Sequence, residues 1–194
     1  MRAQTTGNTL ALTTYHVLAS PPRLQKLKEE LSQICLANPC EVISYKKLEA
    51  LPYLSACINE GLRLGTGVSG RLPRINRTRA TRYKDHILPP GTPISMTIRD
   101  LYYQPDIFHN PHDFNPERWL DLDVETKRHL EKYLVLFSRG PRACVGKNLA
   151  MAELQMVIGN LFSRFDMELY KTGVQDVAMA HDFFARLDQQ IRQG

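Results

Sequence analysis

One cysteine in a glycine-containing turn is the residue best suited to do chemistry in this chain. Residues 137–146 read Phe-Ser-Arg-Gly-Pro-Arg-Ala-Cys-Val-Gly, and Gly140-Pro141 predicts a tight turn before Cys144. A helix is expected directly after this turn, so its dipole and the charge of Arg142 both favour a thiolate. Gly146 lets a flat ligand or another backbone approach closely. Such a thiolate is suited to bind a soft or borderline metal, whereas a cysteine taken alone is more simply interpreted as a buried free thiol.

Two charged motifs precede this turn. The stretch Asn59-Glu60-Gly61-Leu62-Arg63 places Glu60 and Arg63 three residues apart, on one face of an expected helix. A second motif reads Pro116-Glu117-Arg118-Trp119. Taken alone, the first pair is most simply an exposed helix ion pair, which adds little stability.

The three motifs together resemble a known family. Five positions, Phe137, Gly140, Arg142, Cys144 and Gly146, fit the pattern F-x-x-G-x-R-x-C-x-G. This pattern resembles the haem-binding loop of the cytochrome P-450 superfamily, the haem-thiolate monooxygenases. The E-x-x-R and P-E-R-[FW] motifs occur upstream in the family's order. The resemblance implies that Cys144 is the axial ligand of haem b, iron protoporphyrin IX, and that the other four residues also belong to the cofactor-binding loop.

The resemblance also assigns supporting residues. Glu60, Arg63 and Arg118 are implied to form a buried charged triad that holds the core and the cysteine loop in register, because charges that satisfy one another avoid the cost of single buried charges. Arg74 and Arg142 match positions at which many members offer an arginine to a haem propionate. Guanidinium–carboxylate pairing is the physical reason for arginine at both positions.

Thr5 is the candidate catalytic residue by resemblance. Residues 1–6, Met-Arg-Ala-Gln-Thr-Thr, fall where the family has A-G-x-[DE]-T-[TS], and Thr5 aligns with the threonine that takes part in oxygen activation. A hydroxyl at this place can relay protons. Gln4 replaces the usual acid and cannot deliver a proton, while Met1 and Arg2 replace the alanine and glycine. The alternative interpretation of this stretch is a frayed first turn of a helix.

The elements expected around these residues are mostly helices. We expect the following, in chain order: the end of an apolar helix over 7–19, an amphipathic helix after Ser20-Pro21-Pro22, a helix over 52–64, short strands at Arg71–Ile75 and Pro93–Thr97, a long ordered loop over 104–124, helices over 125–133 and 147–164, and a small hairpin from Phe165 to Leu187 with a turn near Gly173. The last long helix is expected to bury one face, formed by Ala150, Leu154, Val157, Ile158, Leu161 and Phe165. The order predicts an α-dominated α+β fold, and the resemblance implies the C-terminal portion of the cytochrome P-450 fold.

The composition and net charge limit the classes of protein to which this chain can belong. The chain has 194 residues, 43% hydrophobic and 23% charged, which suits one globular domain and excludes bulk disorder. The net charge of +5 permits an acidic protein partner or an anionic membrane surface and does not indicate nucleic acid. We expect no signal peptide and no membrane span. The resemblance implies that residues 1–194 form a single partial domain whose N-terminal half is absent.

The remaining cysteines and histidines have simpler interpretations. Cys35, Cys40 and Cys57 are interpreted as small buried hydrophobes, and the first two could bridge only in an oxidising compartment. His109 and His112 lie three residues apart, but nothing of ligand type completes a metal site with them.

The resemblance implies a monooxygenase that activates dioxygen at a cysteine-ligated haem and hydroxylates a small apolar molecule. Three stretches (Gly67–Ile75, Tyr83–Thr97 and Lys132–Phe137) resemble fungal secondary-metabolism members that oxygenate terpenoids. The implied electron donor is an NADPH-dependent flavoprotein reductase, for which the basic residues Arg139, Arg142 and Lys147 could form a docking face. The implied location is the cytosolic face of the endoplasmic reticulum.

Two other functions stay open at this point. One is a truncated, catalytically silent fragment that binds haem weakly or serves as an interaction module. The other is a haem-thiolate isomerase or dehydratase, whose chemistry needs no proton relay and would tolerate Gln4.

Overall fold

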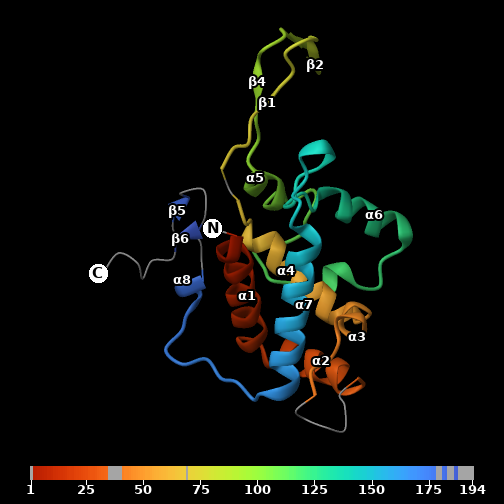
Figure 1. Cartoon of the computed structure of the whole chain (residues 1–194), viewed down its shortest axis with the longest axis vertical. Coiled ribbons are helices and arrows are strands. Elements are labelled where there is room, and N and C mark those ends of the chain that lie inside the picture. Colours follow the sequence, from red (N-terminus) through yellow and green to blue (C-terminus); the bar gives the residue numbers. More distant parts are fainter. Residues whose placement is uncertain (1, 35–40, 69, 178–180, 183–185, 188–194) are drawn as a thin grey trace.

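Three long helices form the centre of the protein, for which we describe a computed structural model. It describes residues 2–34, 41–68, 70–177, 181–182 and 186–187. The central helices are α1 (Arg2–Leu18), α4 (Pro52–Gly65) and α7 (Lys147–Arg164), and each contacts the other two (Figure 1). The buried cluster lies between them and includes Val17, Leu54 and Ile158.

Shorter helices surround this centre. They are α2 (Pro21–Ser32), α3 (Tyr45–Glu49), α5 (Ile98–Tyr102), α6 (Val124–Tyr133), α8 (Val174–Val177) and the 3-10 turns η1 (Pro116–Trp119) and η2 (Gly140–Arg142). The predicted helices over 52–64, 125–133 and 147–164 are confirmed to within one residue. Ser20 does precede α2, but its side chain makes no capping hydrogen bond, so the prolines begin the helix without it. The helices α3, α5 and α8 were not predicted, because five or fewer residues carry too little periodicity.

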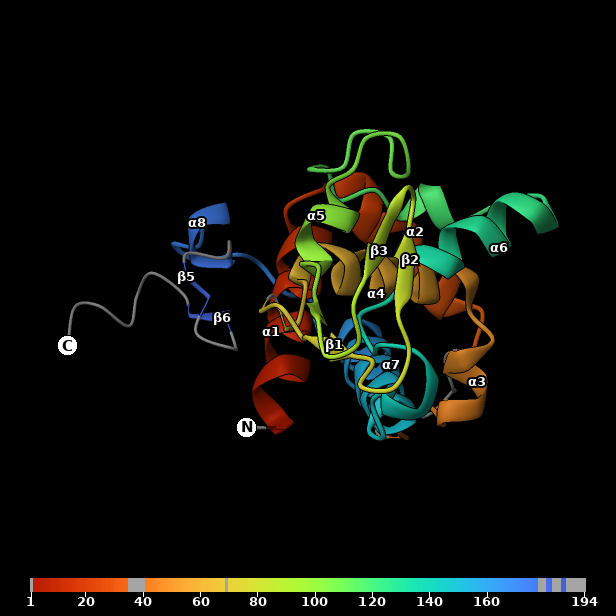
Figure 2. The same cartoon turned by 90° about the horizontal axis from the view of Figure 1, so that it is seen from above.

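The strands form three small antiparallel pairs. β1 (Arg74–Ile75) pairs with β4 (Pro93–Ile94), β2 (Thr81–Tyr83) pairs with β3 (His86–Leu88), and β5 (His181–Asp182) pairs with β6 (Arg186–Leu187). The first two pairs form one long hairpin that extends away from the helices (Figure 1); in the view from above, β2 and β3 lie in front of α4 (Figure 2). Both predicted strands exist but are shorter than expected. The described part is therefore α-dominated α+β, as the sequence predicts.

The tail differs from its prediction. The Gly173 amide donates to Asp176 Oδ2 at 2.8 Å and opens α8, so the turn signal at Gly173 begins a short helix instead of closing a hairpin. The hairpin lies further on, at β5 and β6. An aspartate three residues after a glycine is compatible with the start of a helix as well as with a turn. For this reason the prediction of a hairpin turn at Gly173 was wrong.

The buried face of α7 is also rotated from the expected one. Leu154, Ile158 and Phe162 are buried, whereas Val157 and Phe165 are 45% and 56% exposed. Gly159 belongs to the buried face, because a Cβ there would collide with the side chain of Leu48. The predicted face was the most apolar one. The face of α7 that is buried includes Gly159, whose missing side chain lets α3 pack closely.

Close approach of α1 to α4 also depends on a glycine. A Cβ at Gly61 would collide with the hydroxyl of Thr13, and one at Gly65 would lie 3.7 Å from the hydroxyl of Thr9. Both threonines are buried. The contact brings the first turns of α1 over the end of α4, where the candidate site lies. Within the described residues, no helix is long and apolar enough to cross a lipid bilayer.

Candidate functional site

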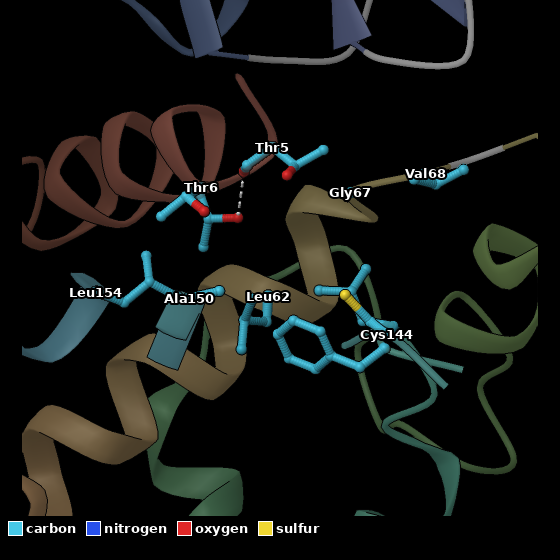
Figure 3. A pocket seen from close by; sticks show the side chains of 11 residues that line it. Thr5, Thr6, Leu62, Gly67, Val68, Cys144, Ala150 and Leu154 are labelled. Atoms are coloured by element: carbon cyan, nitrogen blue, oxygen red, sulfur yellow. Dashed lines mark hydrogen bonds between the residues drawn. The ribbon is translucent and has the colours of Figure 1, made fainter. Parts of the chain in front are cut away.

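An apolar cavity lies where α1, α4, α7 and the cysteine loop meet (Figure 3). It encloses about 460 Å³ of empty space, including the part open to solvent. Polar atoms contribute little to its walls. The lining residues are Thr5, Thr6, Thr9, Leu62, Gly67, Val68, Leu136, Phe137, Cys144, Ala150 and Leu154. The structure thus brings Thr5, Phe137 and Cys144, which lie far apart in the sequence, to one cavity.

Backbone hydrogen bonds shape the cysteine loop. The Cys144 amide donates to the Phe137 carbonyl at 2.7 Å, and the Ala143 amide donates to the Gly140 carbonyl at 3.0 Å. Gly140 has a φ of +71° and Ser138 a φ of +59°, a conformation that costs a non-glycine residue free energy. The expected tight turn is therefore present. It brings the backbone of Cys144 back to Phe137, so that the two residues share a hydrogen bond.

Cys144 is exposed, so the interpretation of a buried free thiol is wrong. It stands three residues before α7, and its carbonyl accepts from the Lys147 amide at 3.4 Å. Gly146 is the residue directly before α7, and a Cβ there would lie 3.8 Å from the Cys144 sulfur. The thiol is therefore accessible at the start of a long helix, on a wall of an apolar cavity.

The two arginines expected at the rim have different surroundings. Arg74 donates from Nη2 to the Ser138 hydroxyl at 3.1 Å, which joins β1 to the cysteine loop. Arg142 is exposed in η2 and forms no hydrogen bond or ion pair within the described part of the chain. Both guanidinium groups therefore have donors available for an anionic ligand.

These residues fit a cysteine-ligated haem. The exposed Cys144 thiol supplies the donor that the group needs, the apolar walls suit a flat hydrophobic ring, and Arg74 and Arg142 suit its carboxylates. The fit rests on the chemistry of the donors and on the cavity they share.

Behind the cavity lies a charged cluster built on the fully buried side chains of Glu60 and Arg63. Arg63 pairs with Glu60 through two hydrogen bonds, Nε to Oε2 at 3.0 Å and Nη2 to Oε1 at 2.7 Å. The remaining donors of Arg63 reach the carbonyls of Tyr102, Pro111 and Asp113 at 2.7–3.0 Å. All five donors of the guanidinium are thus satisfied. Since both side chains are fully buried, the interpretation as an exposed ion pair is wrong.

Glu60 is satisfied just as completely. Besides Arg63, its carboxylate accepts from Arg118 Nε at 3.0 Å, from Trp119 Nε1 at 2.9 Å and from the Asn115 amide at 3.0 Å. Arg118 also donates to the carbonyls of His109 and Asn110. The cluster therefore fastens the long loop over 104–124 to α4. Trp119 is a partner that the sequence motif contained but whose hydrogen bond to Glu60 was not anticipated.

The triad residues do not line the cavity. α4 carries Glu60 and Arg63, and its Leu62 side chain lines the cavity. The cluster thus holds the helix whose other face forms a wall of the site, which is a supporting position.

On the opposite wall, α1 presents a row of threonines. Thr5, Thr6 and Thr9 line the cavity, and the Thr9 hydroxyl donates to the Thr5 carbonyl at 3.1 Å (Figure 3). The helix is continuous from Arg2, so Thr5 stands within it and not in an unwound end. Thr6 and Thr9 were not identified from the sequence; their spacing of one and four residues from Thr5 could have indicated them.

The turn after α4 supplies another contact that the sequence did not reveal. Thr66 and Gly67 have φ values of +47° and +44°, and a Cβ at Gly67 would lie 2.8 Å from a Leu136 methyl group. Leu136 directly precedes Phe137. A glycine at this position therefore lets the end of α4 support the start of the cysteine loop.

Other candidate residues lie away from the cavity. Cys57 is buried in α4, and burial raises the pKa of its thiol. Cys35 and Cys40 lie outside the described residues. The His112 ring packs against Tyr103, with ring centres 4.7 Å apart. In the described part of the chain, no group of three histidine, cysteine or acidic residues is placed to hold a metal ion.

The chain belongs to the cytochrome P-450 family, whose profile matches residues 3–190. It is 43% identical over 182 residues to a cytochrome P-450 monooxygenase of Sordaria araneosa, which is 93% of this chain and 35% of that protein. It is 42% identical over 183 residues to N-acetyltryptophan 6-hydroxylase of Emericella nidulans, and the matched region covers 93% of this chain and 35% of that protein. To a cytochrome P-450 monooxygenase of Fusarium sporotrichioides it is 37% identical over 178 residues, 92% of this chain and 34% of that protein. The chain thus spans about a third of the length of these relatives.

Proposed function

We propose that this chain carries the cysteine-ligand side of the haem site of a monooxygenase that hydroxylates a small apolar molecule. The observation that supports this most strongly is the exposed Cys144 thiol on an apolar cavity that it shares with Thr5. When bound, the haem would supply the activation of dioxygen by two external electrons. A monooxygenase reaction is also favoured by the names of the relatives.

The roles of the residues follow from their positions. Cys144 would bind the iron, and the bond from its amide to the Phe137 carbonyl holds the sulfur in place. Arg74 and Arg142 would donate hydrogen bonds to the carboxylates of the haem. The loop positions Phe137, Gly140 and Gly146 would shape the proximal wall. The Glu60–Arg63–Arg118 cluster would keep α4 and the loop over 104–124 rigid behind it.

Thr5 is proposed as the residue that holds or passes a proton at its Oγ1. Its carbonyl accepts from the Thr9 hydroxyl, which fixes the backbone of that turn. Gln4, in the place of the usual acid, has no proton to deliver, so the source of the proton must be another group or water. The Thr5→Ala variant is expected to yield less product for each NADPH consumed while its haem spectrum stays the same.

The substrate is proposed to be a small apolar molecule of terpenoid type. The apolar lining of the cavity supports the apolar character. Two relatives are named as 6-hydroxylases of tryptophan or N-acetyltryptophan, so an aromatic substrate is the nearest competitor. A panel that contains both classes separates them by the oxygenated product formed.

The electron donor is proposed to be an NADPH-dependent flavoprotein reductase. A polar cleft next to the cavity shares Leu62 and Phe137 with it and is lined by four cations, Arg128, Lys132, Arg139 and Lys147. A basic cleft beside the proposed ligand loop suits an acidic partner, whose rate of encounter would fall with added salt.

The decisive experiment is the carbon-monoxide difference spectrum of the reduced protein after reconstitution with haem. The strongly red-shifted Soret band of thiolate-ligated iron is expected for the wild type and is expected to be absent in Cys144→Ala. Cys57→Ala, at the other cysteine in the described part, is the matched control and should keep the band. A histidine-type or free-haem spectrum, or an unchanged band in Cys144→Ala, would contradict the proposal. The former result would favour the catalytically silent fragment.

A further inference from the structure

Arg139 of the cysteine loop is bonded to the end of a neighbouring helix. Its Nη2 group donates to the carbonyls of Glu131 at 3.0 Å and of Lys132 at 2.8 Å. Both carbonyls belong to the last turn of α6, which ends at Tyr133. Within the residues that the structure describes, Arg139 forms no ion pair. The guanidinium is therefore held by the end of a helix and not by a carboxylate.

The last turn of α6 needs such a donor. A helix leaves its last four carbonyls without amide partners from within the helix. Backbone amides that follow α6 donate to three of these carbonyls, but no backbone amide in the described chain donates to the carbonyl of Lys132. The C-terminal end of a helix also carries a partial negative charge, which a cation stabilises. Arg139 thus satisfies the carbonyl that the backbone leaves open and neutralises this helix end.

The segment between α6 and Arg139 folds back on itself. The Ser138 amide donates to the Val135 carbonyl at 2.8 Å, and Ser138 has a φ of +59°. This reversal carries Arg139 back to the helix that the chain has just left, so the contact joins residues seven and eight positions apart. Because the conformation of Ser138 costs free energy, the bonds of Arg139 directly after it help to hold the reversal in place.

The same segment carries the backbone of Cys144. The Cys144 amide donates to the Phe137 carbonyl at 2.7 Å, two residues before Arg139. The Ser138 hydroxyl accepts from Arg74 at 3.1 Å. Two adjacent side chains therefore fasten residues 137–139 to two separate elements, Arg139 to α6 and Ser138 to β1. Whatever holds this segment also holds the residue that is bonded to it.

We propose that Arg139 is a positioning residue for Cys144: by binding the end of α6, it keeps residues 137–139, and through them the thiol, in one place on the cavity wall. A side chain that ligates a metal has to be held within about 0.5 Å of its productive geometry. This inference deepens the proposed function, because the need for a fixed thiol rests on Cys144 being the ligand. The anchoring itself does not depend on haem.

The competing role for Arg139 is that of one more cation in the basic cleft next to the cavity. Arg128 is the matched residue for that role, because it is also an exposed arginine, lines the same cleft and stands on α6. In the described part of the chain, the Arg128 side chain forms no ion pair. The same substitution at both positions removes equal charge from the cleft, but only the one at Arg139 removes the anchor.

The test is amide hydrogen exchange of the haem-free chain, followed residue by residue by NMR. Exchange of the Cys144 amide reports the opening of its bond to Phe137. In Arg139→Met we expect this exchange to be about three- to tenfold faster, the effect of losing charge-assisted hydrogen bonds that water partly replaces. Arg128→Met should stay within about twofold of the wild type. The amide of Ile158, in the core of α7, should keep its rate in both variants.

Arg139→Lys tests whether the hydrogen bonds are the cause. An ammonium group has three donors on one nitrogen, so a lysine can serve both carbonyls from one atom, as Nη2 does. We expect the exchange of the Cys144 amide to return most of the way to the wild-type rate. A lysine variant as fast as Arg139→Met would show that the bonds to α6 are not what holds the segment.

A second measurement follows the thiol as a ligand. After reconstitution, spectra are compared at equal amounts of bound haem. Arg139→Met should show a smaller share of the strongly red-shifted carbon-monoxide band of thiolate-ligated iron, whereas Arg139→Lys and Arg128→Met should match the wild type. A residue that only stabilised the fold would lower the amount of haem bound and leave this share unchanged.

Four results overturn the proposal. They are an unchanged rate at Cys144 in Arg139→Met, an equal rise in Arg128→Met, an equal rise at Ile158, which would make the effect one of global stability, and faster exchange at Cys144 with an unchanged share of the red-shifted band. If the wild type gives no red-shifted band, the proposed function fails instead. The exchange rates, which need no haem, then decide by themselves whether Arg139 positions Cys144.

Discussion

The charged cluster of Glu60, Arg63 and Arg118 and the cysteine loop over 137–146 are built in opposite ways. In the cluster, five donors of one arginine meet five acceptors, and both α4 side chains are fully buried. In the loop, Cys144 and Arg142 are exposed, and the shape depends on a few backbone hydrogen bonds and two residues with positive φ. Rigidity and reactivity are thus placed in different parts of the molecule.

This difference indicates that this chain keeps the residues that stabilise the fold apart from those available for chemistry. A buried charge network tolerates no missing partner, because each group left behind would be an unsolvated charge. An exposed loop tolerates substitution, because water replaces what is lost. An exposed residue such as Cys144 is therefore free to take part in chemistry without supporting the fold.

The largest loss of stability is expected from Arg63→Ala, in the buried cluster. It leaves the Glu60 carboxylate buried with a partial set of donors and frees the carbonyls of Tyr102, Pro111 and Asp113. We expect a loss of about 3–5 kcal/mol in the free energy of unfolding, measured by urea denaturation. This loss is a large fraction of the free energy of unfolding of an ordinary domain, about 5–15 kcal/mol.

Cys144→Ala is the matched change in the loop. The thiol is exposed, so the free energy of unfolding should stay within about 0.5 kcal/mol of the wild type. Comparable losses for the two variants would show that the loop supports the fold and that the separation drawn above is wrong.

An intermediate effect is expected for Gly61→Ala, which tests how α1 is held over α4. Its Cβ would collide with the Thr13 hydroxyl, so we expect a loss of about 1–3 kcal/mol in thermal or urea unfolding. Thr13→Ala removes that hydroxyl, and the double variant should recover most of the loss. Additive losses in the double variant would mean that the close approach of the two helices is not the cause.

The smallest effect is expected at the edge of the cluster, from the titration of Glu117. Burial raises the pKa of its carboxyl, but hydrogen bonds from Lys26, its own amide and Tyr53 outweigh burial and hold the pKa below the ordinary 4.5. A lowered pKa in the folded state stabilises the protein above the unfolded value. That contribution is lost as the pH falls below 4.5, and it is less than about 1 kcal/mol because the pair is half exposed to solvent.

Lys26→Gln is the variant that isolates this titration. Its urea midpoint should fall less than that of the wild type between neutral pH and a pH below 4.5. Parallel pH profiles for the two proteins would show that the Lys26–Glu117 pair contributes nothing measurable.

Much of the helical part of the fold could be predicted from periodicity and prolines. The helices beginning at Pro21 and Pro52 and the helix Lys147–Arg164 were expected within about a residue. Periodicity failed where a contact chose the buried face, as at Gly159, and where a turn residue had two uses, as at Gly173. The five-residue helices α3 and α5 depend on neighbours that no local pattern specifies.

In the candidate site, too, some features could be predicted from the sequence and others could not. The residue types of the cysteine loop and of the two charged motifs were visible as patterns, because each function needs a particular side chain. The partners were not visible: Trp119 on Glu60, Thr9 on the Thr5 carbonyl and Leu136 against Gly67. In each of these contacts, packing or helix geometry determines the distance between the two residues.

The amino-acid sequence therefore specified the chemistry: a thiol in a turn before a helix, an acid and two arginines able to satisfy one another, and the family to which they belong. Tertiary structure decided what those groups face. It buried Glu60 with Arg63, left Cys144 open on an apolar cavity, and left the cations of residues 71–97 without an ion pair among the described residues. The physical reason is that side-chain type fixes which interactions a residue can make, whereas burial and distance arise only when distant segments pack together.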